Sequence, residues 1–141
     1  MLKIDYFNKI DSPISLLFIN KIAKLTGSVV KKLHGQAEII VIGDKEMAEI
    51  NRAHRGKNKT TDVLSFAFLE DKKIKTQYLG QIFISFPQIK KQAKQYGVSI
   101  KEEFSRMLVH GLLHLAGYDH DSLKKEKKMF SLQEKIVKKI V

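Results

Sequence analysis

The chain of 141 residues contains no cysteine, no tryptophan and only two prolines. Without cysteine it can form no disulfide, no thiolate-ligated zinc site and no cysteine nucleophile, which is compatible with a reducing compartment. Long apolar runs are also missing, because the largely apolar stretch near the N-terminus covers only residues 14–19. That stretch is too short for the core of a signal peptide or for a membrane span. We therefore expect a cytoplasmic protein that does not contact a membrane.

Basic residues are abundant: 26 Lys and Arg stand against 15 Asp and Glu, which gives a net charge of +11 at pH 7. Such an excess is typical of proteins that bind a polyanion, although a lysine-rich solvated surface explains it equally well. The length fits one domain over residues 1–141, and a chain of this size buries about two-thirds of its unfolded surface. With 43% hydrophobic and 29% charged residues, the composition is that of an ordinary globular protein.

Apolar periodicity and turn signals predict the element order β-α-β-α-β-β-α-α-α. Strands are expected over residues 2–7, 37–42, 62–69 and 79–85. Ser12-Pro13 is predicted to begin the first helix, which should end near Gly35. Later helices are expected over residues 44–53, 87–97, 99–117 and 122–141. The fold class is therefore α+β or mixed α/β, with a small mixed sheet of about four strands packed with helices.

Three of the five histidines lie in the stretch HGLLHLAGYDH, residues 110–120. His110 and His114 are four residues apart, so on a helix both imidazoles face the same side. Gly117 suits the left-handed conformation that ends a helix, after which the chain can return His120 to the same point. Three imidazoles with an open fourth position are typical of catalytic zinc. We expect one zinc ion per chain, with nickel, copper and iron left open because imidazole also suits them.

The same spacing resembles the zinc motif of the metzincin metalloproteases, with one departure. In those enzymes a glutamate follows the first histidine and activates the attacking water. Here that position is Gly111, which has no side chain to accept a proton. The sequence therefore disfavours a protease while keeping the metal ligands.

A second informative stretch is NRAHRGKNKTTDVLSF, residues 51–66, whose first eleven residues carry four basic side chains and no acid. Gly56 lets the backbone turn sharply, and the guanidinium of Arg55 can hold a phosphate in a bidentate manner. In isolation, a solvated basic loop is the more common explanation.

Together, RGKNKTTDVLSF, LGQIFIS and LVHGLLHLAGYDH resemble, in this order, the YbeY family of metal-dependent endoribonucleases and ribosomal RNA maturation factors. The similarity covers roughly residues 38–122. It implies a zincin-like fold, the three histidines as metal ligands, and Arg55 as the functionally important arginine of the family. It also implies that Lys57 and Lys59 are basic positions beside that arginine. We therefore expect Arg55 to act in catalysis, and Arg55, Lys57 and Lys59 to bind RNA.

Two residues depart from the family pattern. Thr60 stands where the family usually has proline, which is expected to loosen the loop slightly. Gln81 stands where the family usually has an acidic residue, so any role of that acid is in doubt here. Gly111 and Gln81 thus leave the obvious positions for a general base empty. The attacking group is left open between water and a neighbouring ribose 2′-hydroxyl, with Arg55 expected to clamp the scissile phosphate opposite the ion.

The resemblance implies a single metal-dependent hydrolase domain that cleaves single-stranded RNA. Its expected role is maturation of the 3′ end of small-subunit (16S) ribosomal RNA and ribosome quality control. The expected partners are ribosomal RNA and the small subunit, and contacts with ribosomal proteins are left open. The alternative is a non-catalytic ribosome-assembly factor whose histidine metal site and basic loop only bind RNA. Metal removal separates the two, because binding could survive it and turnover should not.

Overall fold

The computed structural model describes residues 2–68 and 77–141 of the chain. Its elements follow the predicted order and are β1 (Leu2–Asn8), α1 (Leu16–Val29), β2 (Gly35–Ile42), α2 (Asp44–Arg55), β3 (Val63–Ala67), β4 (Tyr78–Ser85), α3 (Phe86–Tyr96), α4 (Ile100–Leu115) and α5 (Leu123–Ile140). The expected class, a mixed sheet packed with helices, is confirmed. The end of the strand expected over 62–69, and most of the connection that follows it, lie outside the described residues.

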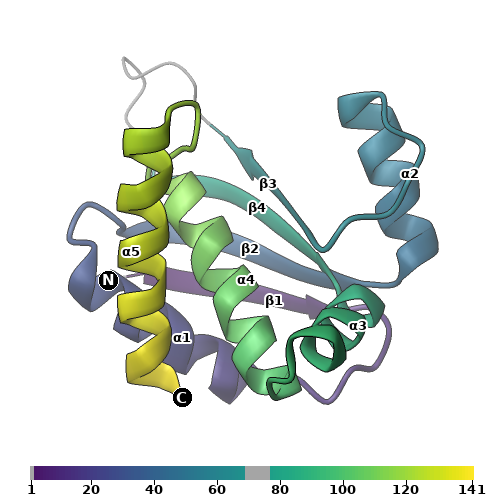
Figure 1. The fold of residues 1–141 in the computed structure, drawn as a ribbon, viewed down its shortest axis with the longest axis horizontal. Coiled ribbons are helices and arrows are strands. Elements are labelled where there is room, and N and C mark those ends of the chain that lie inside the picture. The colour runs from purple at the N-terminus through teal and green to yellow at the C-terminus, as the bar shows by residue number, and fades with distance from the viewer. Residues whose placement is uncertain (1, 69–76) are drawn as a thin grey trace.

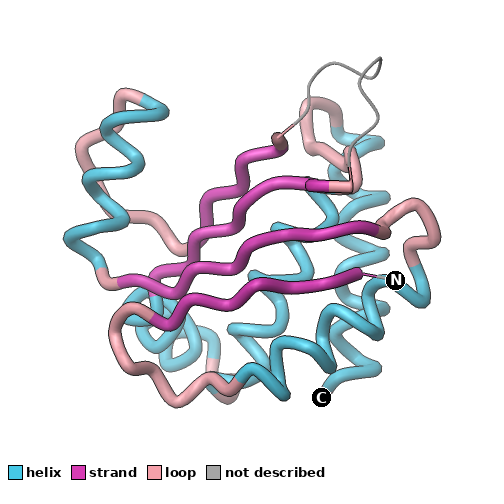
Figure 2. The backbone as a smooth tube through the Cα atoms, turned by 180° about the vertical axis from the view of Figure 1, so that it is seen from behind, coloured by secondary structure: helices cyan, strands magenta, loops and turns pink. Residues whose placement is uncertain are grey.

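The four strands form one sheet in the order β1-β2-β4-β3. β1, β2 and β4 run parallel, and β3 pairs with β4 in the antiparallel direction. Helices α1, α4 and α5 lie on one face of this sheet, as Figure 1 shows. Seen from behind, in Figure 2, the strands lie in front of these helices, and α2 stands beside one end of the sheet. No helix within 2–68 and 77–141 is both long enough and apolar enough to cross a membrane.

Helix α1 begins later than the sequence predicted. Its N-cap is Ser15, whose hydroxyl accepts the backbone N–H of Phe18 at 3.1 Å. Ser12 is held in the preceding turn instead, because the Asn8 side chain accepts its N–H at 2.9 Å and donates to its carbonyl at 2.8 Å. The helix also ends at Val29 rather than near Gly35, which opens β2. The prediction of Ser12-Pro13 as the helix start was therefore wrong.

Helix α4 crosses the middle of the helical layer and carries the buried centre of the core, including Phe104, Leu108 and Leu112, each with no exposed surface. Gly111 faces the sheet. A Cβ built on it would lie 2.9 Å from Cγ2 of Ile82 on β4 and 3.1 Å from the Ser65 hydroxyl on β3. The missing side chain therefore allows the helix to approach the sheet closely, and a glutamate would not fit there.

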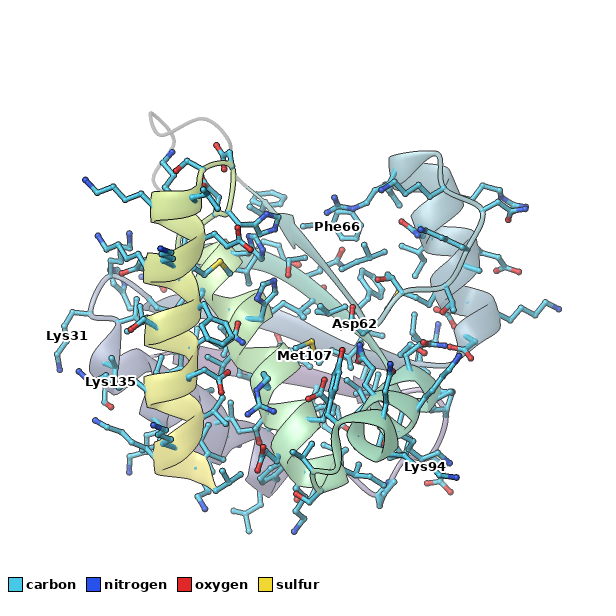
Figure 3. The ribbon with its side chains drawn as sticks, viewed as in Figure 1. Lys31, Asp62, Phe66, Lys94, Met107 and Lys135 are labelled. Carbon is cyan, nitrogen blue, oxygen red and sulfur yellow. The ribbon has the colours of Figure 1, made fainter. Side chains whose placement is uncertain are left out.

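Helix α5 begins at the N-cap Ser122, whose hydroxyl accepts the backbone N–H of Lys125 at 3.2 Å. Its buried face packs on the core through Met129, Gln133, Ile136, Val137 and Ile140. Its lysines are exposed, as Figure 3 shows for Lys135. The apolar residues of this helix do not all lie on the buried face, because Leu123 and Phe130 are exposed. The packing of α5 brings Gln133 against α4.

Candidate metal centre and basic cleft

The three predicted histidines converge at the C-terminal end of α4. His110 and His114 lie on one face of the helix with their Nε2 atoms 3.2 Å apart. Gly117 has a φ of +98°, so the chain turns and returns His120 to the same point. One ligand nitrogen from each ring lies within 4.8 Å of the others. Two imidazoles bound to one tetrahedral ion at ordinary Zn–N lengths have nitrogens about 3.3 Å apart, so the spacing of His110 and His114 fits such an ion.

A residue that the sequence did not indicate orients one of these rings. Gln133 of α5 is 5% exposed, and its Oε1 accepts the Nδ1–H of His110 at 2.8 Å. The Nε2 of His110 therefore carries the free lone pair on the side of His114. Fixing the tautomer through the second ring nitrogen is common among metal-binding histidines.

Gln133 is itself held in place by a charged network. Its amide donates to Glu134 at 3.2 Å, and Glu134 accepts two hydrogen bonds from the Arg106 guanidinium, at 2.9 and 3.0 Å. Arg106 also pairs with Glu102 and with the buried Glu103 on its own helix. The hydrogen bond from Arg106 holds the pKa of Glu134 below its ordinary value, whereas burial raises the pKa of Glu103. This network leaves the carbonyl of the Gln133 amide directed at His110.

The imidazole of His114 is suited to bind a cation in its neutral form. Burial lowers its pKa to about 4, and the nearby His110, His120 and Arg55 act in the same direction, against a hydrogen bond with the Tyr118 backbone. Metal ions bind the neutral imidazole, so a ring that resists protonation at neutral pH keeps its lone pair available.

The triad borders a cleft of about 760 Å³ whose other residues include Arg55, Lys57 and Lys59. Arg55 was expected in a loop, but it is the last residue of α2, and Gly56 ends that helix with a φ of +68°. Its guanidinium lies 5.9 Å from the ring centre of Phe66 on β3, and Figure 3 shows Phe66 between α2 and the α4–α5 pair. The structure thus brings the predicted basic residues and the predicted metal ligands into one cleft.

The basic loop after Gly56 is tied to α2 at two points. The buried Asn51 side chain donates to the carbonyl of Lys59 at 2.9 Å, and the Thr60 hydroxyl donates to Asp44 at 3.1 Å. The tie to Asp44 is one that proline could not make, so the departure at Thr60 adds a hydrogen bond to the loop. Lys59 is consequently presented to the cleft from an anchored backbone.

The side chains of Gln81 and Asp119 make hydrogen bonds to groups outside the three histidines. Gln81 donates to Glu38 of β2 at 2.8 Å. Because side chains alternate along a strand and its neighbour Ile82 contacts α4, Gln81 lies on the opposite face of the sheet from the triad. Asp119 accepts the backbone N–H of Asp121 at 3.4 Å and so shapes the turn. Gln81 therefore supplies no base at the histidines.

Comparisons with known proteins agree with the motifs. A family model described as Endoribonuclease YbeY matches residues 8–141. A protein of that name from Thermodesulfovibrio yellowstonii is 39% identical over 132 residues, which cover 92% of this chain and 83% of that protein. Another, from Brevibacillus brevis, is 35% identical over an alignment that covers 99% of this chain and 98% of that protein. The solution structure of TM1509 from Thermotoga maritima matches with a TM-score of 0.69 at 26% identity, covering 99% of this chain and 89% of that one.

Proposed function

This chain belongs to the endoribonuclease YbeY family, and from that membership we propose that it is a metal-dependent endoribonuclease formed by one domain over residues 1–141. The observation that carries the proposal is the convergence of three imidazoles beside a cleft bordered by Arg55, Lys57 and Lys59. Such a cleft combines positive charge for a polynucleotide backbone with ligands for a cation.

In this proposal His110, His114 and His120 hold one zinc ion, which supplies a Lewis acid for the phosphate oxygens when it is bound. Arg55 binds the scissile phosphate from the α2 side of the cleft and stabilises the charge that develops on it. Lys57 and Lys59 hold the neighbouring phosphates. Gln133 keeps His110 in the tautomer whose Nε2 faces the triad.

We assign the substrate as small-subunit ribosomal RNA, cut in the cytoplasm during maturation of its 3′ end and during ribosome quality control. The motif resemblance and the family membership support this role. In this proposal Arg55, Lys57 and Lys59 bind phosphates, which carry no sequence information, so the ribosome supplies the specificity.

The direct test is cleavage of a fragment from the 3′ end of small-subunit ribosomal RNA by zinc-reconstituted protein. His114→Ala should lose both bound zinc and cleavage, while His34→Ala, an exposed histidine outside the triad, should keep both. Arg55→Ala should keep the zinc and lose cleavage by about a hundredfold or more, against Arg52→Ala one turn earlier on α2 as its control.

Three outcomes distinguish the alternatives. Equal cleavage by the protein and by His114→Ala would mean a contaminating nuclease. Zinc-independent RNA binding without cleavage, on the naked fragment and on the small subunit, would favour the non-catalytic assembly factor. Unchanged cleavage by Arg55→Ala would remove the phosphate-binding role from that residue.

A further inference from the structure

A second cavity, of about 790 Å³, opens on the other side of the histidine triad. It lies between α5, the N-terminal half of α4 and the end of α3. It shares Asp62, Met107, His110 and His120 with the basic cleft, so the two cavities meet at the metal ligands. Figure 3 labels Asp62 and Met107 in the space between α5 and α2. A polymer that crosses the triad from the basic cleft therefore enters this second cavity.

The second cavity differs from the basic cleft in its chemistry. Its rim carries large apolar side chains that are exposed to solvent: Leu123 at 76%, and Tyr96 and Phe130 at 61% each. Large apolar side chains left exposed around a concavity mark binding sites. Its acidic lining residues, Asp62, Glu102, Glu103 and Glu126, outnumber the basic Arg106 and Lys127. This cavity therefore lacks the excess of basic side chains that the basic cleft offers to phosphates, and a neutral aromatic group needs no such charge.

We propose that this second cavity, the apolar groove, binds one unpaired base of the RNA whose phosphates lie in the basic cleft, with Phe130 and Tyr96 as the stacking residues. The inference rests on the proposed function, and it names the part of the substrate that each cavity takes. Aromatic side chains stack on unpaired bases of any sequence, and a base within a duplex is not available for such stacking. The groove thus selects single-stranded RNA at the metal site.

Phe130 is the residue to change, because its exposed side chain contributes little to the core. The melting temperature of Phe130→Ala checks that the variant folds. Two ten-nucleotide single-stranded RNAs, both made with 2′-O-methyl riboses and phosphorothioate linkages so that they resist cleavage, are compared by equilibrium binding to zinc-loaded protein. One carries adenine throughout, and the other is abasic at every position, so their phosphate charges are equal. The unchanged protein should bind the adenine RNA about tenfold more tightly. Phe130→Ala should lose that preference, and Tyr96→Ala should reduce it.

Two control variants separate the contribution of the base to RNA affinity from that of the phosphates. Phe7→Ala, at an exposed phenylalanine on β1 outside the groove, should keep the tenfold preference. Lys59→Ala should weaken binding of both RNAs by the same factor. Equal affinity of the unchanged protein for the two RNAs, or a preference that survives in Phe130→Ala, would overturn the inference while leaving the proposed function standing. Binding of neither RNA would overturn both.

Discussion

Gln133 determines which nitrogen of His110 faces the other two histidines, because its carbonyl accepts the Nδ1–H at 2.8 Å. We predict that Gln133→Leu lowers zinc affinity about 10- to 100-fold, measured by competition with a chelator of known affinity. Gln133→Glu should recover most of the loss, since a carboxylate also accepts the bond.

The control for this prediction is Gln36→Leu, at an exposed glutamine of β2. Nitrogen-15 NMR of the metal-free protein supplies a second measurement, because loss of the hydrogen bond should release His110 into a mixture of tautomers. A Gln133→Leu variant with a single His110 tautomer and unchanged zinc affinity would contradict the role.

The convergence of the three histidines could be predicted from the sequence because they lie within eleven residues, where helix periodicity and one glycine set their geometry. Gln133 could not, because it is 23 positions from His110 and reaches it through the packing of α5 on α4. Arg55 borders the same cleft as the three histidines, but it was predicted in a loop and lies in α2. Gly56 ends α2 with a positive φ, and the same local signal that was used at Gly117 would have placed Arg55 in the last turn of the helix.

At the scale of the element, the approach of α4 to the sheet depends on Gly111. We predict that Gly111→Ala lowers the free energy of unfolding by about 1–3 kcal/mol, because the added Cβ meets the buried Ile82 at 2.9 Å. Gly27→Ala is the matched control on α1, where the nearest atoms lie at 3.7 and 3.9 Å. It should instead stabilise the protein by about 0.5–1 kcal/mol. Urea denaturation measures both, and equal effects would exclude a packing constraint at Gly111.

Asp44, the first residue of α2, links this helix through hydrogen bonds to β4, to α3 and to the basic loop. Burial raises its pKa, but hydrogen bonds from Ser85, Gln88 and Thr60 outweigh burial and leave the pKa below the ordinary 3.8. A carboxylate with a lowered folded-state pKa stabilises fully above its unfolded pKa, and that contribution is lost as the pH falls through the folded value.

We therefore predict that Asp44→Asn lowers stability by about 1–2 kcal/mol at pH 7, and that its difference from the unchanged protein shrinks below pH 3.8. Urea denaturation at a series of pH values measures this difference. Glu46→Gln, in the same first turn, is the control. A difference that stays constant from pH 7 to pH 3 would show that Asp44 acts without its charge.

The start of α1 illustrates what an element prediction lacks. Ser12 and Ser15 are both good N-caps, and Pro13 favours the first. The choice is made by Asn8, which binds both backbone groups of Ser12 and holds it in a turn. The order of the elements was predictable from apolar periodicity and turn signals, whereas this boundary depended on one side chain, Asn8, that binds the backbone four residues later.

At the scale of the whole molecule, the charge of +11 makes RNA affinity sensitive to salt. For a short single-stranded RNA that spans only the basic cleft, we predict that Lys57→Ala combined with Lys59→Ala reduces the slope of log K against log salt by about 0.7 per lysine. Titrations at several salt concentrations measure the slope. Lys135→Ala combined with Lys139→Ala, on the exposed face of α5, should leave it unchanged. An equal change in slope for the two double variants would mean that the RNA has no defined path across the basic cleft.

The segment from His110 to Gln133 forms a loop that is closed by a hydrogen bond between its two ends. The chain leaves α4, passes His120, enters α5 and returns to His110 through the hydrogen bond of Gln133. A bound ion adds a second closure across the same segment, between His110 and His120. The end of α4 and the start of α5 are then linked both by the hydrogen bond and by the ion. Release of the ion and separation of α5 from α4 should therefore be coupled. Amide hydrogens of α5 should accordingly exchange faster in the chelated protein, which makes the last helix a reporter of whether the site is filled.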